Sequence, residues 1–135
     1  MAYRISKIDP LDLQARKAIG INIPFSVDGV FSSNYKSKDA IKNNLINYML
    51  TGRGERFMNP TFGSGLRNLL FEQINSQRLA TLADTISQEV SMMFPKVVVT
   101  SLDIKPDTDR NTIELVMSYQ IRYTNIADSV SINFI

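Results

Sequence analysis

The sequence predicts an α+β domain in which three helices pack on one face of a small antiparallel sheet, preceded by an extended N-terminal arm. Two changes of pattern carry this prediction. Residues 1–36 show no helical period, residues 37–94 place apolar side chains at helical spacing, and from residue 97 onward apolar and polar side chains alternate. Helices followed by strands favour separate layers over an alternating βαβ arrangement. We therefore divide the 135 residues into an arm, 1–36, and a single domain, 37–135.

The arm is predicted to lie extended on other surfaces, because Pro10, Gly20 and Gly29 interrupt it and its last residues are polar. A short turn of helix is expected after Pro10. Only Ile21–Val27 has the composition of a strand. Pro24 restricts that strand to a sheet edge, since proline has no backbone N–H to donate.

Three helices are expected between residues 37 and 94. Ser37 is the predicted N-cap of the first helix, and Gly52 is its predicted end. A short second helix begins near Ser64. The third begins at Ser76 and stops before Pro95, which disfavours the helical region for the residue before it. The apolar positions at helical spacing are Ile41, Leu45, Tyr48 and Met49, then Leu66, Leu69 and Leu70, then Leu79, Leu82, Ala83, Ile86, Val90 and Phe94.

Three strands of an antiparallel meander are expected after Pro95. The run KVVVTSLDI is rich in β-branched residues, and KPDTDRN supplies turn residues. Alternation then predicts one buried and one solvated face for the sheet. The predicted core positions are Ile113, Leu115, Met117, Tyr119, Ile121 and Tyr123 in the second strand, and Val130, Ile132 and Phe134 in the third. The third strand is expected to continue to the last residue, Ile135.

The segment TGRGERFMNPTFGSGL, residues 51–66, holds most of the turn residues between the first two helices. Glycines before a helix can bind phosphate, but Asn68 stands where a dinucleotide loop needs glycine, and a helix precedes the segment in place of a parallel strand. The Gly-Lys-Ser/Thr ending of a phosphate loop is also absent. These glycines therefore indicate a sharp connection between helices.

We interpret this segment as a rigid loop that serves as a contact surface. Gly52 and Gly54 are expected to take positive φ, and residues 59–62 to form a tight turn. Arg56 is expected to bind a carbonyl or carboxylate oxygen, with a solvated arginine as the alternative. The apolar residues Phe57, Met58 and Phe62 are expected to pack beneath the loop, and a long loop with such anchors is usually functional.

The composition argues against catalysis. The chain has no histidine and no cysteine, so acid–base chemistry would fall to carboxylates, lysines or tyrosines. A glycosidase needs two facing carboxyls, whereas Glu55 has no carboxylate near it in sequence. The other glutamates, Glu72, Glu89 and Glu114, are interpreted as solvated, and Asp103, Asp107 and Asp109 lack calcium-loop spacing. We predict no catalytic residues, no metal, no cofactor and no small-molecule substrate.

Charge and hydropathy exclude two further classes of partner. The formal net charge is +2 and the basic residues are scattered, so no nucleic-acid surface is expected. The chain has no apolar run of membrane-spanning length and no secretory signal, so no membrane partner is expected.

The motif GRGERFMNPTFGSGL, followed by RNLLFEQI, strongly resembles the baseplate wedge and tail-sheath initiator proteins of contractile-tailed bacteriophages. The matching baseplate component of type VI secretion systems is related to them. KIDP and IGINIPF upstream, and the long helix with its proline stop downstream, fit the same family. The residues that carry the resemblance are Gly54, Arg56, Pro60, Phe62, Gly63, Leu66, Leu70 and Phe71.

The resemblance implies a structural, non-enzymatic protein of the virion tail baseplate, assembled in the host cytoplasm. Its implied partners are other baseplate wedge proteins and the tail sheath protein. The contact with the wedge core is assigned to Gly54, Glu55, Arg56, Pro60, Phe62, Gly63, Phe94, Pro95 and Lys96. Many family members have Glu-Pro-Arg where this chain has residues 94–96, and lysine does not reproduce the two-pronged contact of arginine.

The resemblance also implies that the protein starts sheath assembly by β-strand addition, in which a strand of one chain joins the sheet of another. This contact is assigned to Val130, Ser131, Ile132, Asn133 and Phe134. Two alternatives remain open at this point: a peptidoglycan-cleaving, lysozyme-like baseplate enzyme, and an adaptor of an unrelated complex.

Overall fold

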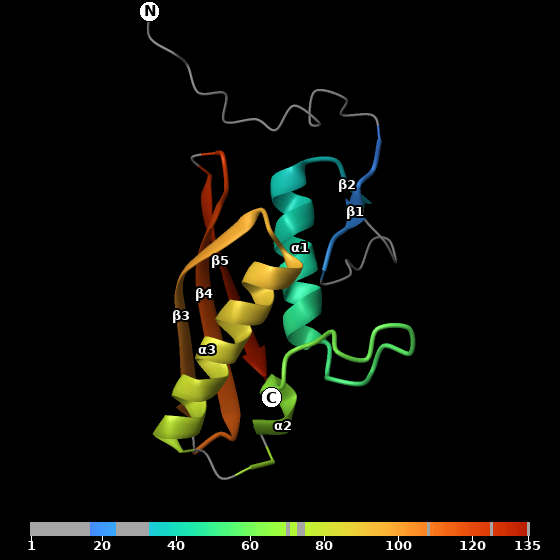
Figure 1. Ribbon diagram of the computed structural model, residues 1–135. Helices are drawn as coiled ribbons and strands as arrows, with labels where there is room; N and C mark the ends of the chain where they lie inside the picture. The colour runs from blue at the N-terminus through green and yellow to red at the C-terminus, as the bar shows by residue number, and fades with distance from the viewer. Residues whose placement is uncertain are drawn as a thin grey trace, which may run out of the picture.

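Figure 1 shows a computed structural model of the chain, which describes residues 17–23, 33–69, 71–72, 75–107, 109–124 and 126–134. The described part contains three helices, a two-stranded sheet and a three-stranded antiparallel sheet. The predicted α+β class is therefore confirmed. None of the helices in this part has the length and hydropathy of a membrane span.

Helix α1 spans Ser37–Leu50, one residue away from the predicted limits. Its N-cap is Lys36, whose backbone is extended, so the prediction of Ser37 as the cap was wrong by one position. Thr51 closes the helix, because its backbone N–H and its hydroxyl both donate to the carbonyl of Asn47. Gly52 therefore does not end the helix, and it has no positive φ.

Helix α3, Ser76–Met93, agrees with the periodicity of the sequence. The side chain of Asn75 caps it by accepting from the N–H of Gln77, and Phe94 is its C-cap, directly before the predicted proline stop. Between α1 and α3, α2 is a single turn, Leu66–Leu69, whose two leucines are buried.

The large sheet is a meander of order β3-β4-β5, as predicted. Its strands are β3 (Val97–Asp107), β4 (Thr112–Ile121) and β5 (Ala127–Phe134). Strand β3 continues through Lys105 and Pro106, which were predicted to lie in the turn. A proline is tolerated there because β3 is an edge strand. Tyr123 was wrongly assigned to the core face: it lies in the β4–β5 turn with φ 64° and is 93% exposed.

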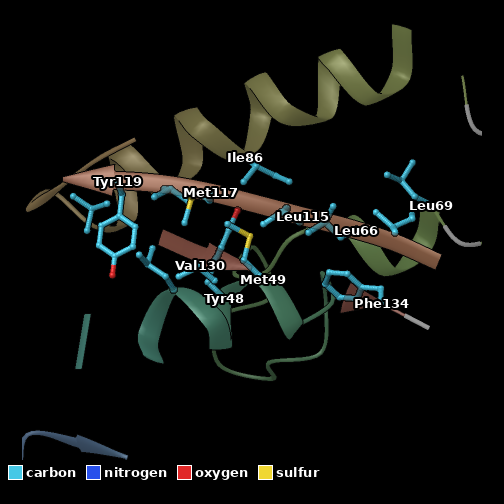
Figure 2. Close-up of a cluster of buried hydrophobic side chains, with 14 of the residues drawn as sticks. Tyr48, Met49, Leu66, Leu69, Ile86, Leu115, Met117, Tyr119, Val130 and Phe134 are labelled. Carbon is cyan, nitrogen blue, oxygen red and sulfur yellow. The ribbon is translucent and has the colours of Figure 1, made fainter. Parts of the chain in front are cut away.

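The helices cover one face of this sheet, with α3 over β3 and α1 beside β5 (Figure 1). Figure 2 shows the core that lies between these layers. The buried residues are Leu45, Tyr48, Met49, Leu66, Leu69, Ile86, Val90, Val97, Ile113, Leu115, Met117, Tyr119, Ile121, Val130 and Phe134. This set includes the five predicted core positions that lie in β4, because strict alternation places their side chains on the same side of the sheet.

The small sheet pairs β1 (Gly20–Ile21) with β2 (Ser33–Asn34) beside α1 (Figure 1). Part of the predicted strand at Ile21–Val27 is thus confirmed, and β2 was missed. Residues 24–27, the turn predicted after Pro10, Leu70 and Ile135 lie outside the described residues. The division between residues 1–36 and 37–135 remains a prediction.

Candidate functional site

The loop between α1 and α2 is held by its own hydrogen bonds. The N–H of Gly54 donates to the carbonyl of Pro60 at 2.9 Å, and the N–H of Phe62 donates to the carbonyl of Asn59 at 3.1 Å, which confirms the predicted tight turn. Ser64, 1% exposed, donates its hydroxyl to the carbonyl of Met49 at 2.7 Å. These bonds fix the base and the tip of the loop relative to α1.

Two glycines of the loop require their conformational freedom. Gly63 has φ +122°, and a Cβ at this position would lie 2.6 Å from the carbonyl oxygen of Thr51. Gly54 has φ +83° with no atom within 4 Å of a Cβ. The close approach of the loop backbone to the end of α1 therefore depends on Gly63, and the conformation of the loop tip on Gly54.

Of the three apolar residues that were predicted to pack beneath the loop, only Phe62 does so. Its ring meets that of Tyr48 edge-on, with centroids 5.4 Å apart. Phe57 and Met58 are 96% and 91% exposed, so their predicted burial was wrong. The predicted oxygen partner of Arg56 was also wrong: its guanidinium carbon lies 3.9 Å from the centroid of the Phe62 ring. The loop thus presents two apolar side chains and one cation outward.

A cluster of Tyr48, Arg53 and Glu89 attaches this loop to α3. The carboxylate of Glu89 accepts from the Tyr48 hydroxyl through one oxygen and from the Arg53 guanidinium through the other. Burial, followed by the hydrogen bond and charge of Glu89, raises the pKa of Tyr48 above the ordinary value of tyrosine. The prediction of Glu89 as a solvated residue was wrong. Position 89 lies on the same helix face as Leu82, Ile86 and Met93. This spacing was the signal in the sequence that Glu89 faces the core side.

Two further glutamates, Glu55 and Glu72, form exposed contacts. Glu55 pairs with Arg67 at 3.7 Å and Glu72 with Arg78 at 2.7 Å, with every one of these side chains at least half exposed. Glu72 is the one acidic residue among those described that line an open groove of about 570 Å³ between α2 and α3. Within the described chain no group of three metal-ligating side chains occurs.

The corner at residues 94–96 contacts Tyr48, the same residue that Phe62 of the loop contacts. The ring of Phe94 lies 6.2 Å from that of Tyr48, centroid to centroid, on the core side. Pro95 and Lys96 are exposed. The carbonyl of Lys96 accepts from the N–H of Arg122 at 2.7 Å, which fixes the corner to the end of β4. Phe62 and Phe94 therefore face inward, and the exposed parts of the two segments are the loop tip and Pro95-Lys96.

The two edges of the large sheet differ. Strand β3 carries Pro106, a bulge between Val99 and Ser101, and several charged side chains. Strand β5 pairs with β4 without a bulge over its whole length and has one charged residue, Asp128. Proline, bulges and charges are the features that prevent the pairing of an edge strand with another chain. Strand β5 lacks most of them.

The backbone groups that β5 directs outward can be derived from its register. The N–H of Ile121 donates to the carbonyl of Ile126, and the register runs on from this pair without a shift. Hydrogen-bonded and non-bonded pairs alternate along an antiparallel ladder. The backbone groups of Val130, Ile132 and Phe134 therefore point to β4, whereas those of Ser129, Ser131 and Asn133 point away from it.

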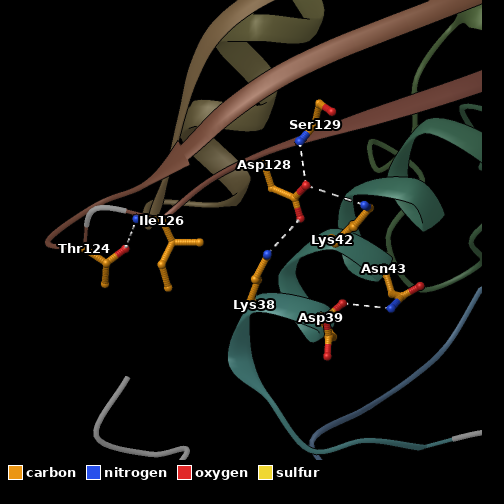
Figure 3. A network of polar contacts seen from close by, with 8 residues as sticks. All are labelled: Lys38, Asp39, Lys42, Asn43, Thr124, Ile126, Asp128 and Ser129. Carbon is orange, nitrogen blue, oxygen red and sulfur yellow. Dashed lines mark hydrogen bonds and ion pairs between the residues drawn. The ribbon is translucent and has the colours of Figure 1, made fainter. Parts of the chain in front are cut away.

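Asp128 lies at the start of β5 and connects it to α1 (Figure 3). Its carboxylate accepts from the N–H of Ser129 at 2.8 Å. Lys38 and Lys42, one turn apart on α1, lie 3.9 and 3.6 Å from its two oxygens. The Asp128 side chain is 20% exposed, whereas the lysines are about twice as exposed. This cluster fixes α1 against the edge strand.

Comparisons with known proteins identify relatives of this fold. Residues 36–128 match the family described as baseplate wedge protein gp25. A crystal structure of a candidate tail lysozyme from Geobacter sulfurreducens is similar, with 23% identity, a TM-score of 0.63, and coverage of 73% of this chain and 90% of that one. The cryo-EM baseplate of the anti-feeding prophage has a chain with 21% identity, a TM-score of 0.50, and coverage of 82% and 77%. No curated protein matches the sequence.

Proposed function

Because the chain belongs to the baseplate wedge protein gp25 family, we propose that it is a non-enzymatic wedge protein that starts sheath assembly by β-strand addition at β5. It docks on the wedge core through the loop at residues 54–63 and the corner at residues 94–96. Its partners are then the other wedge proteins and the tail sheath protein, and its location is the tail baseplate, assembled in the host cytoplasm.

The observation that carries strand addition is the difference between the two edges of the sheet. Strand β5 directs the N–H and C=O groups of Ser131 and Asn133 away from β4, and no strand among the described residues pairs with them. Main-chain hydrogen bonds to such an edge supply much of the affinity in β-strand addition. Strand β3 carries Pro106 and a bulge, which makes it the poorer acceptor.

Strand addition is tested by changing one outward backbone donor. Ser131→Pro removes the N–H of residue 131 without removing Val130 and Phe134, which the core needs. Ser131→Ala is the matched control, because it keeps the N–H. We expect sheathed tails by electron microscopy with the alanine variant and tails without sheath with the proline variant. Thermal unfolding of both proteins checks that the fold persists, and normal sheaths with a folded proline variant would contradict the proposal.

Docking of the loop is supported by its rigid backbone and its exposed tip. Phe57 and Met58 are held outward on a hydrogen-bonded loop, so their burial in a partner costs little ordering entropy. Arg56 and Lys96 add cations for which the described residues provide no carboxylate partner. These features favour a partner surface with an apolar pocket and acidic residues beside it.

The docking proposal is tested by co-purification with the wedge proteins of the same tail. Phe57→Ser with Met58→Ser, and separately Arg56→Ala with Lys96→Glu, are each expected to weaken it by tenfold or more, on the order of 1.4 kcal/mol or above. Met92→Ser, which removes another exposed apolar side chain on α3, is the control. Unchanged retention of both double variants would exclude this docking surface.

Peptidoglycan cleavage is the alternative, since a protein of similar fold is described as a candidate tail lysozyme. It requires two facing carboxyls, whereas Glu89 is bound by Tyr48 and Arg53 and the groove between α2 and α3 has Glu72 alone among its described lining residues. Incubation of the purified protein with cell walls decides between the two, with Glu55→Gln and Glu72→Gln as controls. Release of muropeptides by the wild type that either variant abolishes would establish the enzyme.

A further inference from the structure

We infer that Asp128 terminates the open edge of β5 and thereby sets the register of the strand that joins it. The inference rests on the proposed strand addition and names the position at which the added strand must end. It follows from the Asp128 cluster shown in Figure 3 and from the outward direction of alternate backbone groups in β5.

The Asp128 carboxylate occupies a position that an added strand would need. The N–H of Ser129 points away from β4, but it already donates to Asp128 at 2.8 Å. A carbonyl of an incoming strand would have to displace this carboxylate and would meet its negative charge at the same time. Hydrogen bonds to charged groups are stronger than those between neutral groups, so the exchange is unfavourable.

Lys38 and Lys42 hold the carboxylate at this position. They project from α1 at i and i+4, on one side of the helix, and approach different oxygens of Asp128. A lone carboxylate on an exposed strand could rotate away when a partner arrives. Fixed by two cations on a neighbouring helix, it stays at the edge, so the position of α1 determines where the open edge begins.

The usable edge therefore runs from the carbonyl of Ser129 to the backbone of Asn133. Ser131 and Asn133 each offer an N–H and a C=O, and Ser129 offers its C=O alone. A strand that pairs there spans about five residues at one residue per position. Asp128 limits the register on this side, because a shift by two residues toward the start of β5 would place a partner carbonyl against its carboxylate.

The side chains of β5 indicate the chemistry of this strand. On the core face, Val130 and Phe134 are buried, whereas Ile132 between them is only partly buried. On the other face, Ser129, Ser131 and Asn133 are exposed. The partner is thus a short strand with an apolar residue beside Ile132, polar residues on the opposite face, and no acidic residue at the end that meets Asp128.

Amide hydrogen exchange of the full chain, with and without the sheath protein of the same tail, tests the inference. In the wild type we expect the sheath protein to slow exchange at Ser131 and Asn133 and to leave the Ser129 amide unchanged. In Asp128→Ala the free Ser129 amide should exchange faster than in the wild type, and the sheath protein should then protect it. Two results would overturn the inference. One is that the sheath protein slows exchange at the Ser129 amide of the wild type. The other is that the sheath protein leaves exchange at the Ser129 amide of Asp128→Ala unchanged.

Asp107→Ala is the matched control. Asp107 accepts from the backbone N–H groups of Asp109 and Arg110 in the β3–β4 hairpin, so this variant also removes an aspartate that caps backbone N–H groups, at the opposite end of the sheet from Asp128. It should leave the sheath-dependent protection of β5 as in the wild type. Sheath binding that protects no outward amide of β5 would refute strand addition itself. If the sheath protein protects Ser131 and Asn133, and the pattern of protection at Ser129 is the same in the wild type and in Asp128→Ala, the register stop alone would be refuted.

Discussion

At the scale of single residues, the carboxylate of Glu89 connects three segments that are distant in sequence. It accepts hydrogen bonds from Tyr48 of α1 and from Arg53 of the loop, while its own backbone belongs to α3. The loop is thereby placed by a polar contact as well as by the packing of Phe62. Loss of the Glu89 charge should loosen the loop before it unfolds the core.

We predict that Glu89→Gln lowers the free energy of unfolding by about 1–3 kcal/mol, the usual cost of losing a charged hydrogen-bond partner at a largely buried site. Glu72→Gln is the control, since the exposed Glu72–Arg78 pair should contribute less than about 1 kcal/mol. Urea unfolding of the three proteins measures both. Equal stability of the two variants would contradict the role assigned to Glu89.

Two buried tyrosines predict an alkaline limit to stability. The pKa of Tyr48 is raised by burial and by Glu89, and that of Tyr119 by burial and by the charges of Asp128 and Asp39. Above the ordinary tyrosine value of 10.0, the unfolded chain releases protons that the native state keeps. These two groups should thus add no pH dependence to the free energy of unfolding well below pH 10 and lower it above pH 10, by up to about 1.4 kcal/mol per pH unit for each tyrosine.

Tyr48→Phe and Tyr119→Phe should each remove about half of this alkaline slope, as measured by denaturant unfolding between pH 8 and 11. At neutral pH the two variants should differ. Tyr48→Phe loses the bond to Glu89 and costs about 1 kcal/mol, whereas the Tyr119 hydroxyl has no hydrogen-bond partner among the described residues, so Tyr119→Phe should be neutral or stabilising. A slope unchanged in both variants would assign the alkaline loss to other groups.

The backbone of Gly63 makes the sharpest prediction within the loop. Gly63→Ala should cost more than about 2 kcal/mol, because the added Cβ meets the Thr51 carbonyl at 2.6 Å and the backbone has φ +122°. Gly54→Ala adds a Cβ in open space and should cost only about 1 kcal/mol, the strain of its positive φ. Thermal unfolding distinguishes the two, and similar losses would contradict the close approach at Gly63.

At the scale of elements, the strands and helices follow from periodicity, whereas their connections do not. The stripes of α1, α3 and β4 could be predicted because one buried face imposes a repeat on the sequence. Strand β2, Ser33–Asn34, is too short to show a repeat and exists through its pairing with β1. Phe57 and Met58 were assigned inward on hydropathy alone, which cannot tell an anchor of the loop from a side chain held outward.

The β4–β5 turn provides a prediction at this scale. Tyr123 has φ 64° with an exposed ring, a conformation in which tyrosine is strained. Tyr123→Gly should therefore raise the free energy of unfolding by about 1 kcal/mol. In the β3–β4 turn, Asn111 also has a positive φ, 49°, but asparagine tolerates this region, so Asn111→Gly should change little. A loss of stability in Tyr123→Gly would indicate that the ring contributes packing energy.

At the scale of the whole molecule, the members of the hydrophobic cluster that the structure describes all lie between residues 41 and 134. None of its members belongs to β1 or β2, which pack from outside against α1. The predicted division at residue 36 therefore has a simple test. A chain of residues 37–135 should keep the circular dichroism of its helices and sheet and unfold in one cooperative transition, at a moderately lower temperature. Loss of cooperativity would mean that the first 36 residues are part of the domain.

The candidate site was predicted in part. The loop, the corner and the last strand were selected from a resemblance, and the structure joins the first two through the ring of Tyr48. Glu89 and Asp128 were missed because each acts through a partner from another element, Tyr48 in one case and Lys38 and Lys42 in the other. Contacts between elements depend on the packing of helices against the sheet, which no single stretch of sequence displays.

The unequal edges of the large sheet limit the number of chains that can add a strand to one copy of the protein. A sheet with two open edges could accept a strand on each side, and the number of added chains would depend on concentration. Here β3 is blunted by Pro106 and a bulge, whereas β5 is open. If strands join only at β5, each copy has a valence of one. A ring of such copies would then receive as many sheath subunits as it has members, which transfers the symmetry of the baseplate to the first layer of the sheath.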